Sequence, residues 1–204
     1  MVAFIYLCIL LFMIIFSLYL IYLSSNKCPK KIRKFYLVSL SIIVVRYVSL
    51  LSLWLVQRQR MIYFIKIFTQ LNFLAIPLLI LAAIYIFLRD EKRRFDYNYT
   101  FMIILFLGYC LINIFYKLDI RVDTVFGFMV SYKEILVPNL IYLIVISSFV
   151  VITLLFVDKP YSNTSGMKLL LVSLIITVIE FIIFLGGIKI FPYPVLGEIS
   201  MILC

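Results

Sequence analysis

Long apolar runs alternate with short polar links over the whole chain. A helix that crosses a bilayer needs about 20 mostly apolar residues. Runs of this length cover residues 2–23, 35–56, 62–88, 97–116, 139–157 and 168–188. The pattern predicts an all-α fold, a polytopic transmembrane helical bundle that forms a single integral membrane domain over residues 1–204.

A seventh apolar run, residues 195–204, follows Pro194 and is much shorter. As a helix it would extend about 15 Å, whereas the hydrocarbon core is about 30 Å thick. We therefore predict an incomplete seventh helix. It is interpreted as a re-entrant or surface helix, a half-span completed by a partner, or a truncated reading frame; we favour truncation or descent from a longer protein.

The longest link, residues 117–138, has two parts. Polar and apolar residues alternate from Leu118 to Asp123, a period of two that predicts a short extended segment. Residues 125–136 are apolar and aromatic, and we expect them to lie on the membrane surface.

Composition supports a membrane protein. The chain is 66% hydrophobic and 14% charged, with a mean hydropathy of +1.21, against roughly 45–50% apolar and about 25% charged residues in soluble domains. The net charge of +10 is interpreted as cytoplasmic loops that follow the positive-inside rule, and no nucleic-acid partner is expected.

The basic residues favour one topology. The links after the first, third and fifth runs carry five, four and two Lys or Arg residues, with Lys168 at the start of the sixth run counted in the last, against two, three and one in the other links. We therefore expect residues 24–34, 89–96 and 158–167 to be cytoplasmic loops in a multi-pass protein of the cell membrane, with the N-terminus outside.

Two charges fall near the middle of full-length apolar runs, Arg46 in the second and Glu180 in the sixth. Each lies 12 residues after the last basic residue of its cytoplasmic link, or about 18 Å along a helix. An unpaired charge at this depth costs at least about 2.5–3.5 kcal/mol. Equal depth and opposite sign predict an Arg46–Glu180 pair and hence that the second and sixth helices are neighbours. The pair either only fixes helix packing or forms the floor of a cavity open to the outside.

Three further polar residues, Gln70, Asn72 and Asn113, fall in the outer half of the third and fourth runs. With Arg46 and Glu180 they are candidates to line an outward binding pocket. Alternatively, they form interhelical hydrogen bonds worth about 0.6 kcal/mol each.

The third run is long enough to tilt or to begin at the interface. Lys66, Thr69 and Gln70 share one face if it is a continuous helix. Pro77 lies inside it, and we expect a kink there because proline removes a backbone hydrogen bond.

The sequence has no histidine, which excludes His-based triads and His-ligated metal sites within this chain. The four cysteines have no metal-ligand or redox spacing and are interpreted as structural thiols. No nucleotide motif or pair of intramembrane carboxylates is present. We expect neither an enzyme, a cofactor nor a metal.

Three segments carry a family resemblance. They are LNFLAIPLLILAAIYIFLRD at residues 71–90, the end of the fourth run at Asn113, and LGGIKIFPYPVLGEIS at residues 185–200. They resemble the N-terminal seven-transmembrane sensor region of bacterial histidine kinases. The chain departs from that region in lacking the histidine expected near Asn113, a full last helix and an output domain. The resemblance implies a sensor-like input module that signals through a partner.

Two functions are therefore kept. One is an integral membrane sensor-like or receptor-like module without its own catalytic domain. The other is the membrane subunit of a transporter or bacteriocin-immunity-type system, which acts by helix packing with a partner. Both imply the lipid bilayer and a membrane or cytoplasmic protein as partners.

Overall fold

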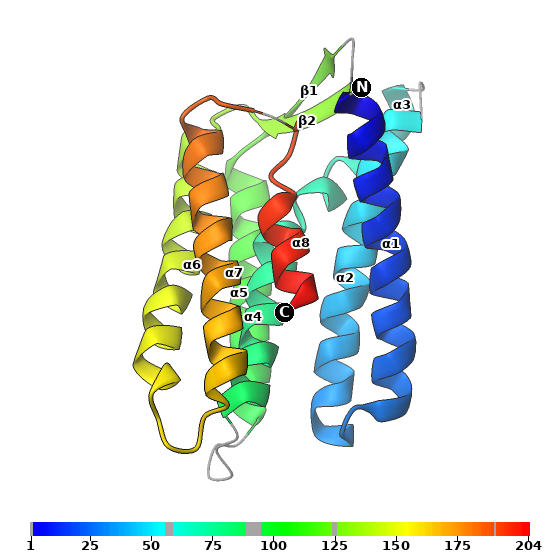
Figure 1. The fold of residues 1–204 in the computed structure, drawn as a ribbon. Coiled ribbons are helices and arrows are strands. Elements are labelled where there is room, and N and C mark those ends of the chain that lie inside the picture. Colours follow the sequence, from blue (N-terminus) through cyan, green and yellow to red (C-terminus); the bar gives the residue numbers. More distant parts are fainter. Residues whose placement is uncertain (1, 56–58, 89–94, 124–125, 190) are drawn as a thin grey trace.

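The computed structural model describes residues 2–55, 59–88, 95–123, 126–189 and 191–204. Six helical segments in these ranges are long and apolar enough to cross a membrane. Most of each lies in α1 (Val2–Lys27), α2 (Lys30–Leu55), α4 (Asn72–Leu88), α5 (Asp96–Phe115), α6 (Leu136–Val157) and α7 (Thr164–Leu185). They run side by side as a bundle (Figure 1), which confirms the expected helical bundle with six candidate membrane spans.

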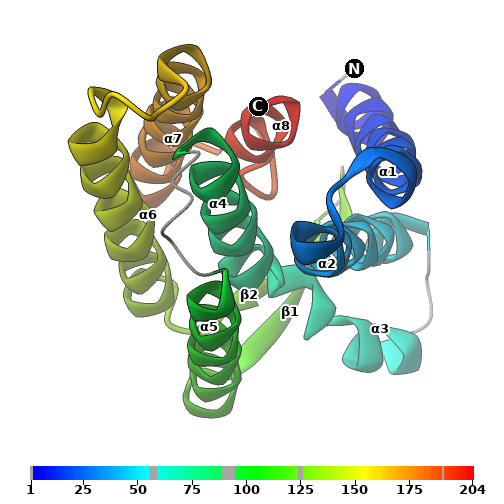
Figure 2. The ribbon, with the colours of Figure 1, turned by 90° about the horizontal axis from the view of Figure 1, so that it is seen from below.

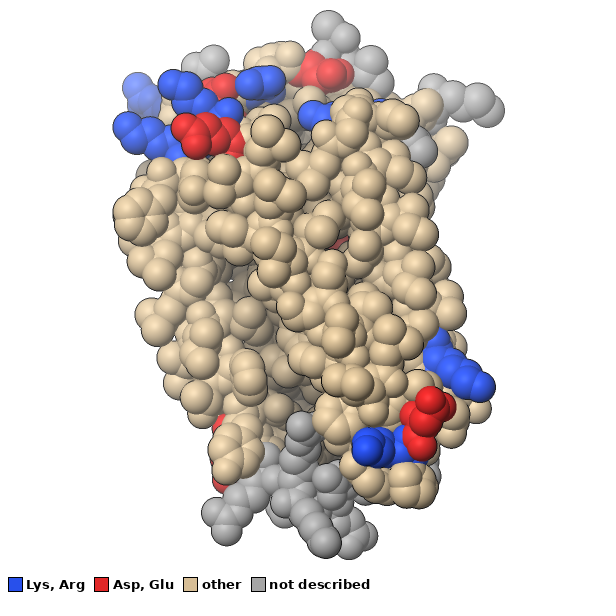
Figure 3. Space-filling view, turned by 90° about the vertical axis from the view of Figure 1, so that its left-hand side faces the viewer, with Lys and Arg blue, Asp and Glu red and all other residues tan. Residues whose placement is uncertain are grey.

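The distribution of charge fits this architecture. On the face shown in Figure 3, Lys, Arg, Asp and Glu gather at the two ends of the bundle, and an almost unbroken belt of uncharged residues lies between them. Such a belt is what the hydrocarbon core of a bilayer requires, because a charged side chain facing lipid is costly.

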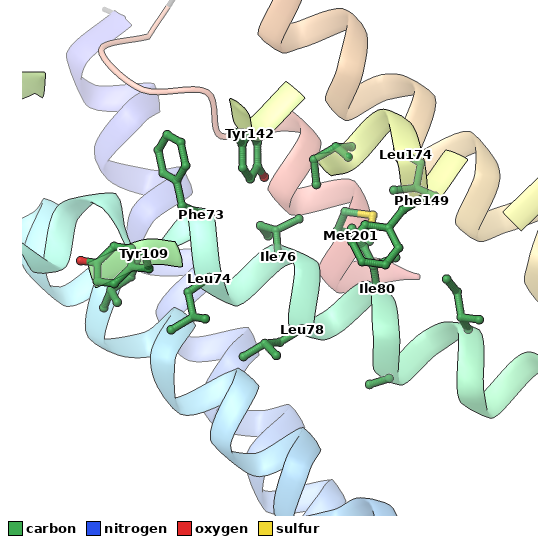
Figure 4. Close-up of a cluster of buried hydrophobic side chains, with 14 of the residues drawn as sticks. Phe73, Leu74, Ile76, Leu78, Ile80, Tyr109, Tyr142, Phe149, Leu174 and Met201 are labelled. Carbon is green, nitrogen blue, oxygen red and sulfur yellow. The ribbon is translucent and has the colours of Figure 1, made fainter. Parts of the chain in front are cut away.

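The core of the bundle is built around α4. Most of α4 is buried, whereas in α5 only Tyr109 is. Figure 4 shows side chains of α4 meeting residues from the surrounding helices, among them Tyr142 of α6, Leu174 of α7 and Met201. Since α4 is enclosed by the other helices, polar groups near its start lie inside the protein.

The third apolar run is not one helix, and the prediction of a continuous span over residues 62–88 is wrong. The chain forms α3 (Gln59–Ile65), a 3₁₀ turn η1 (Phe68–Gln70) and then α4. A break leaves backbone carbonyls without helical partners, and inside a membrane these must be satisfied by other groups. Here the Tyr109 hydroxyl donates to the Ile67 carbonyl (2.6 Å), and Arg46 Nε donates to the Thr69 carbonyl (3.2 Å).

The long link forms a β-hairpin. Strand β1 (Leu118–Asp123) confirms the predicted extended segment, and it pairs antiparallel with β2 (Gly127–Tyr132). The expectation that residues 125–136 lie on the membrane surface stays a prediction, and two alternate residues of β2, Val130 and Tyr132, are buried against the bundle. Strand pairing with β1 satisfies the backbone of β2, so this apolar segment caps the protein. We call this the hairpin end; α1 and α8 (Leu196–Leu203) both begin near it (Figure 1).

The incomplete seventh helix is α8. Its eight residues rise about 12 Å, less than half of the hydrocarbon thickness. It descends from the hairpin end, and its last turn lies at mid-height of the bundle. Figures 1 and 2 show α8 and α4 between α7 and α2. The prediction that the second and sixth membrane helices are neighbours is therefore wrong.

Helix α8 approaches α7 closely at Gly197. A Cβ atom added there would lie 2.7 Å from Thr177 Cα and 2.8 Å from Thr177 Oγ1. One turn further along, Ser173 Oγ donates to the Ser200 carbonyl at 3.0 Å. Small residues at such crossings let two backbones pack and hydrogen-bond within a membrane.

We expect Gly197→Ala to lower the free energy of unfolding by about 1–3 kcal/mol, the usual cost of overpacking, because the backbone of α7 blocks the new methyl group. Unfolding in mixed micelles measures the change. Gly108→Ala is the control, since a Cβ atom at Gly108 would meet nothing within 4 Å. Equal stability of the two variants would contradict the close approach.

Candidate functional site

The mid-helix charge of α2, Arg46, is paired with Glu198 of α8. Arg46 Nη1 donates to Glu198 Oε2, and the Tyr47 hydroxyl donates to the same oxygen at 2.6 Å. Both charged side chains are almost fully buried, Arg46 at 2% and Glu198 at 1% exposure. An ion pair at this depth ties α8 to α2, because separating it leaves two charges in a low-dielectric interior.

The predicted Arg46–Glu180 pair is wrong. The Glu180 carboxylate instead accepts hydrogen bonds from the backbone N–H groups of Val195 (2.8 Å), Leu196 (2.9 Å) and Gly197 (2.5 Å). These groups belong to the first turn of α8, where a helix has unsatisfied donors and a partial positive charge. Glu180 thus caps the N-terminus of α8, and the Arg46–Glu198 ion pair fixes the first turn of α8 to α2.

A cavity lies next to this network, beneath the hairpin. It has a volume of about 80 Å³ and is lined by α2, η1, α4, α6, α7, the hairpin and the segment before α8. A single water needs roughly 10–15 Å³, so the cavity has space for several non-hydrogen atoms. The residues with charged or amide side chains that line it are Arg46, Gln70, Asn72, Asn139, Arg121 and Lys189.

The hairpin is fastened over this cavity at Val130. The Val130 N–H donates to the Tyr193 hydroxyl (2.8 Å), and that hydroxyl donates back to the Val130 carbonyl (3.1 Å). Gln70 Nε2 also donates to this carbonyl, at 3.3 Å. Burial raises the pKa of Tyr193 to about 12, so its hydroxyl keeps the proton that it donates at neutral pH.

We expect Tyr193→Phe to loosen the hairpin, because the Val130 N–H would lose its partner in a buried position. The cost is about 1–3 kcal/mol. Hydrogen exchange should show faster exchange of the Val130 amide. Tyr161→Phe, at an exposed tyrosine in the link between α6 and α7, is the control, and unchanged exchange in Tyr193→Phe would contradict this role of Tyr193.

Three of the five candidate pocket residues line the cavity, namely Arg46, Gln70 and Asn72. The other two do not. Glu180 caps α8, while Asn113 donates to the Tyr109 carbonyl (2.9 Å) and accepts from the Tyr132 hydroxyl at 3.4 Å.

Pro77 lies buried inside α4, and the kink expected there stays a prediction. Within the described ranges, no three His, Cys, Asp or Glu side chains gather as metal ligands. The groups that the cavity offers a ligand are therefore guanidinium, ammonium, amide and hydroxyl.

Sequence reasoning missed four contributors to the site: Glu198, Asn139, Lys189 and Tyr193. Glu198 has a signal in the sequence, since it is a carboxylate within an apolar run. That run was too short to be counted as a span, so its charge was not matched with Arg46. The roles of the other three depend on the position of the hairpin, which hydrophobic periodicity does not give.

No family model, curated protein or solved structure matches this chain. The interpretation of the site therefore rests on its geometry.

Proposed function

We propose that this chain is a sensor-like or receptor-like membrane module that binds a small ligand in the cavity beneath the hairpin. No catalytic role is assigned to it. The observation that carries the proposal is the double position of Arg46, which lines the cavity and also forms the ion pair with α8. A ligand that contacts Arg46 changes the balance of interactions that hold α8. Ligand binding and the position of α8 are then thermodynamically linked.

The proposed orientation places the hairpin end outside the cell. It rests on the excess of Lys and Arg in the links at residues 24–34, 89–96 and 158–167; of these, 24–34 and 158–167 lie at the end opposite the hairpin (Figure 1). The cavity would then face external ligands, and a signal would pass through α8 to a membrane or cytoplasmic partner. In a cysteine-free variant, Lys133→Cys should react with a membrane-impermeant maleimide on intact cells, and Lys159→Cys only after lysis. The reverse pattern would overturn this orientation.

Ligand binding is tested by comparing the wild-type protein with a variant whose cavity is filled. Asn139 lines the cavity, is 8% exposed and forms no side-chain hydrogen bond within the described ranges. Asn139→Phe places a ring in this space, and Ser148→Phe adds the same ring on an exposed part of α6.

The readout is the thermal stability of the three proteins in nanodiscs against a panel of small polar compounds. We expect at least one compound to stabilise the wild type and Ser148→Phe but not Asn139→Phe. If no compound separates Asn139→Phe from the other two proteins, the ligand-binding proposal fails.

A second candidate function, a membrane subunit that packs against a partner, is favoured by the surface of α5. A groove of about 660 Å³ lies between α2, α4 and α5, and its lining is apolar apart from Ser41. A transmembrane helix of another protein would bury this surface by close packing.

This alternative is tested by photocrosslinking in the native membrane. A photoreactive residue at Phe106 in the groove should crosslink to a second protein, whereas one at Ile144, exposed on α6, should not. Equal crosslinking at the two positions would count against a partner in the groove.

A further inference from the structure

We infer that the cavity beneath the hairpin binds a small anion with a carboxylate or phosphate group. This inference rests on the proposed ligand-binding function and specifies the chemical class of the ligand. Its anchors are Arg46 at the inner side of the cavity and Lys189 in the segment between α7 and α8.

The charges that line the cavity favour an anion. Three cationic residues line it and no Asp or Glu does. Two of the cations have carboxylate partners, since Arg46 is paired with Glu198 and Arg121 lies 3.5 Å from Asp119.

Lys189 has no such partner among the described residues, and its ammonium lies 5.1 Å from the centre of the Phe184 ring. The cavity therefore has one positive charge that an anion would neutralise.

Arg46 also keeps hydrogen-bond donors for a ligand. A guanidinium has five N–H groups. Nε donates to the Thr69 carbonyl and Nη1 to Glu198, whereas Nη2 donates to no group in the described part of the chain. Because Arg46 lines the cavity, these remaining donors are available to a carboxylate or phosphate oxygen.

Two buried amides complete the set of donors. Asn72 is 3% exposed, and its Oδ1 atom is buried without a hydrogen-bond partner. Asn139, 8% exposed, has no side-chain hydrogen bond among the described residues. An anion accepts hydrogen bonds only from the NH2 end of an amide, so it pairs with Asn72 when that NH2 group, and not Oδ1, faces the cavity; this pairing removes the free-energy cost of a buried polar group without a partner. The oxygen and nitrogen of such an amide exchange places on a flip of the side chain, so either end can face the ligand.

The beginning of α6 points to the same class of ligand. Ile135, its N-cap residue, lines the cavity and provides no side-chain cap for the helix. The N-terminal end of α6 therefore lies beside the cavity, and the partial positive charge of a helix N-terminus favours an anion there.

Titration of the full chain in nanodiscs with acetate and acetamide tests the inference, because the two compounds have nearly the same shape and only acetate is charged. Inorganic phosphate is the third probe. We expect acetate and phosphate to raise the melting temperature in a saturable way, and acetamide to have at least about 10-fold weaker effect, as expected for loss of one charged hydrogen bond.

Variants at Lys189 and Asn72, with Lys168→Gln as the control, test the site. Lys189→Gln should weaken acetate and phosphate binding by about 10-fold or more, while Lys168→Gln, the same change at an exposed residue near the other end of α7, should bind like the wild type. Asn72→Leu should weaken binding as well, with folding checked by the elution profile. Equal binding by Lys189→Gln and Lys168→Gln would overturn the inference.

A lipid headgroup is a second source of phosphate. Nanodiscs of purely zwitterionic lipid are compared with nanodiscs containing phosphatidylglycerol. Anionic lipid that competes with free phosphate would identify the ligand as a headgroup, whereas unchanged binding identifies a soluble anion. If acetamide binds as well as acetate, the anion inference fails and the ligand-binding function stands. If no small compound binds in the cavity, both fail.

Discussion

Glu198→Ala is expected to lower the free energy of unfolding by about 3–5 kcal/mol, the usual effect of removing one partner of a buried ion pair. The change leaves the Arg46 guanidinium 2% exposed and without its carboxylate, and it also removes the acceptor of the Tyr47 hydroxyl. Equilibrium unfolding in mixed micelles provides the measurement.

The double variant Arg46→Met/Glu198→Met removes both charges, and so distinguishes the loss of the ion pair from the cost of burying one unpaired charge. Without either charge, the interior carries no unpaired ion, so the double variant should be more stable than Glu198→Ala and within about 1–2 kcal/mol of the wild type. Glu134→Ala, at an exposed glutamate after the hairpin, is the control for loss of a carboxylate. Equal losses in Glu198→Ala and Glu134→Ala would refute the Arg46–Glu198 pair.

The membrane helices could be predicted from the sequence because each is encoded locally. A run of apolar residues long enough to span the bilayer has no stable alternative to a helix there, since every backbone group must be paired internally. The third run shows the limit of this reasoning. Its break at Lys66 is stable because Arg46 and Tyr109, which lie in other helices, satisfy the freed carbonyls. A local pattern does not contain this information.

The site was predicted only in part, for a related reason. A charge in the middle of an apolar run must have a partner, so the sequence identified Arg46 as important and paired. The partner of Arg46 was chosen by comparing depths of charges in full-length spans. This comparison left out α8, the half-length helix that carries Glu198. Gln70 and Asn72 line the same cavity as Arg46, and their role in binding stays a prediction. Asn139 and Lys189 reach that cavity only through the packing of α6 and the segment before α8.

The second large effect is expected from Glu180→Ala, which removes the acceptor of the N–H groups of Val195, Leu196 and Gly197. Loss of a helix cap and of its favourable interaction with the helix dipole costs about 2–3 kcal/mol. We expect this cost to appear as more frequent opening of α8, because Glu180 holds the N-terminus of that helix, although the Arg46–Glu198 pair still ties it to α2. Glu180→Gln keeps one oxygen acceptor and should show a smaller effect.

Cys204, directly after α8 and partly buried, reports this opening. In a background with serine at positions 8, 28 and 110, the rate of Cys204 alkylation by a membrane-permeant maleimide measures how often α8 opens. Glu180→Ala should raise this rate by about 30-fold or more, the ratio that corresponds to 2–3 kcal/mol, and Glu180→Gln should fall between it and the wild type. Glu134→Ala should leave the rate unchanged. If Glu180→Ala labels no faster than Glu134→Ala, Glu180 does not hold α8, and the link between the cavity and α8 depends on the Arg46–Glu198 pair alone.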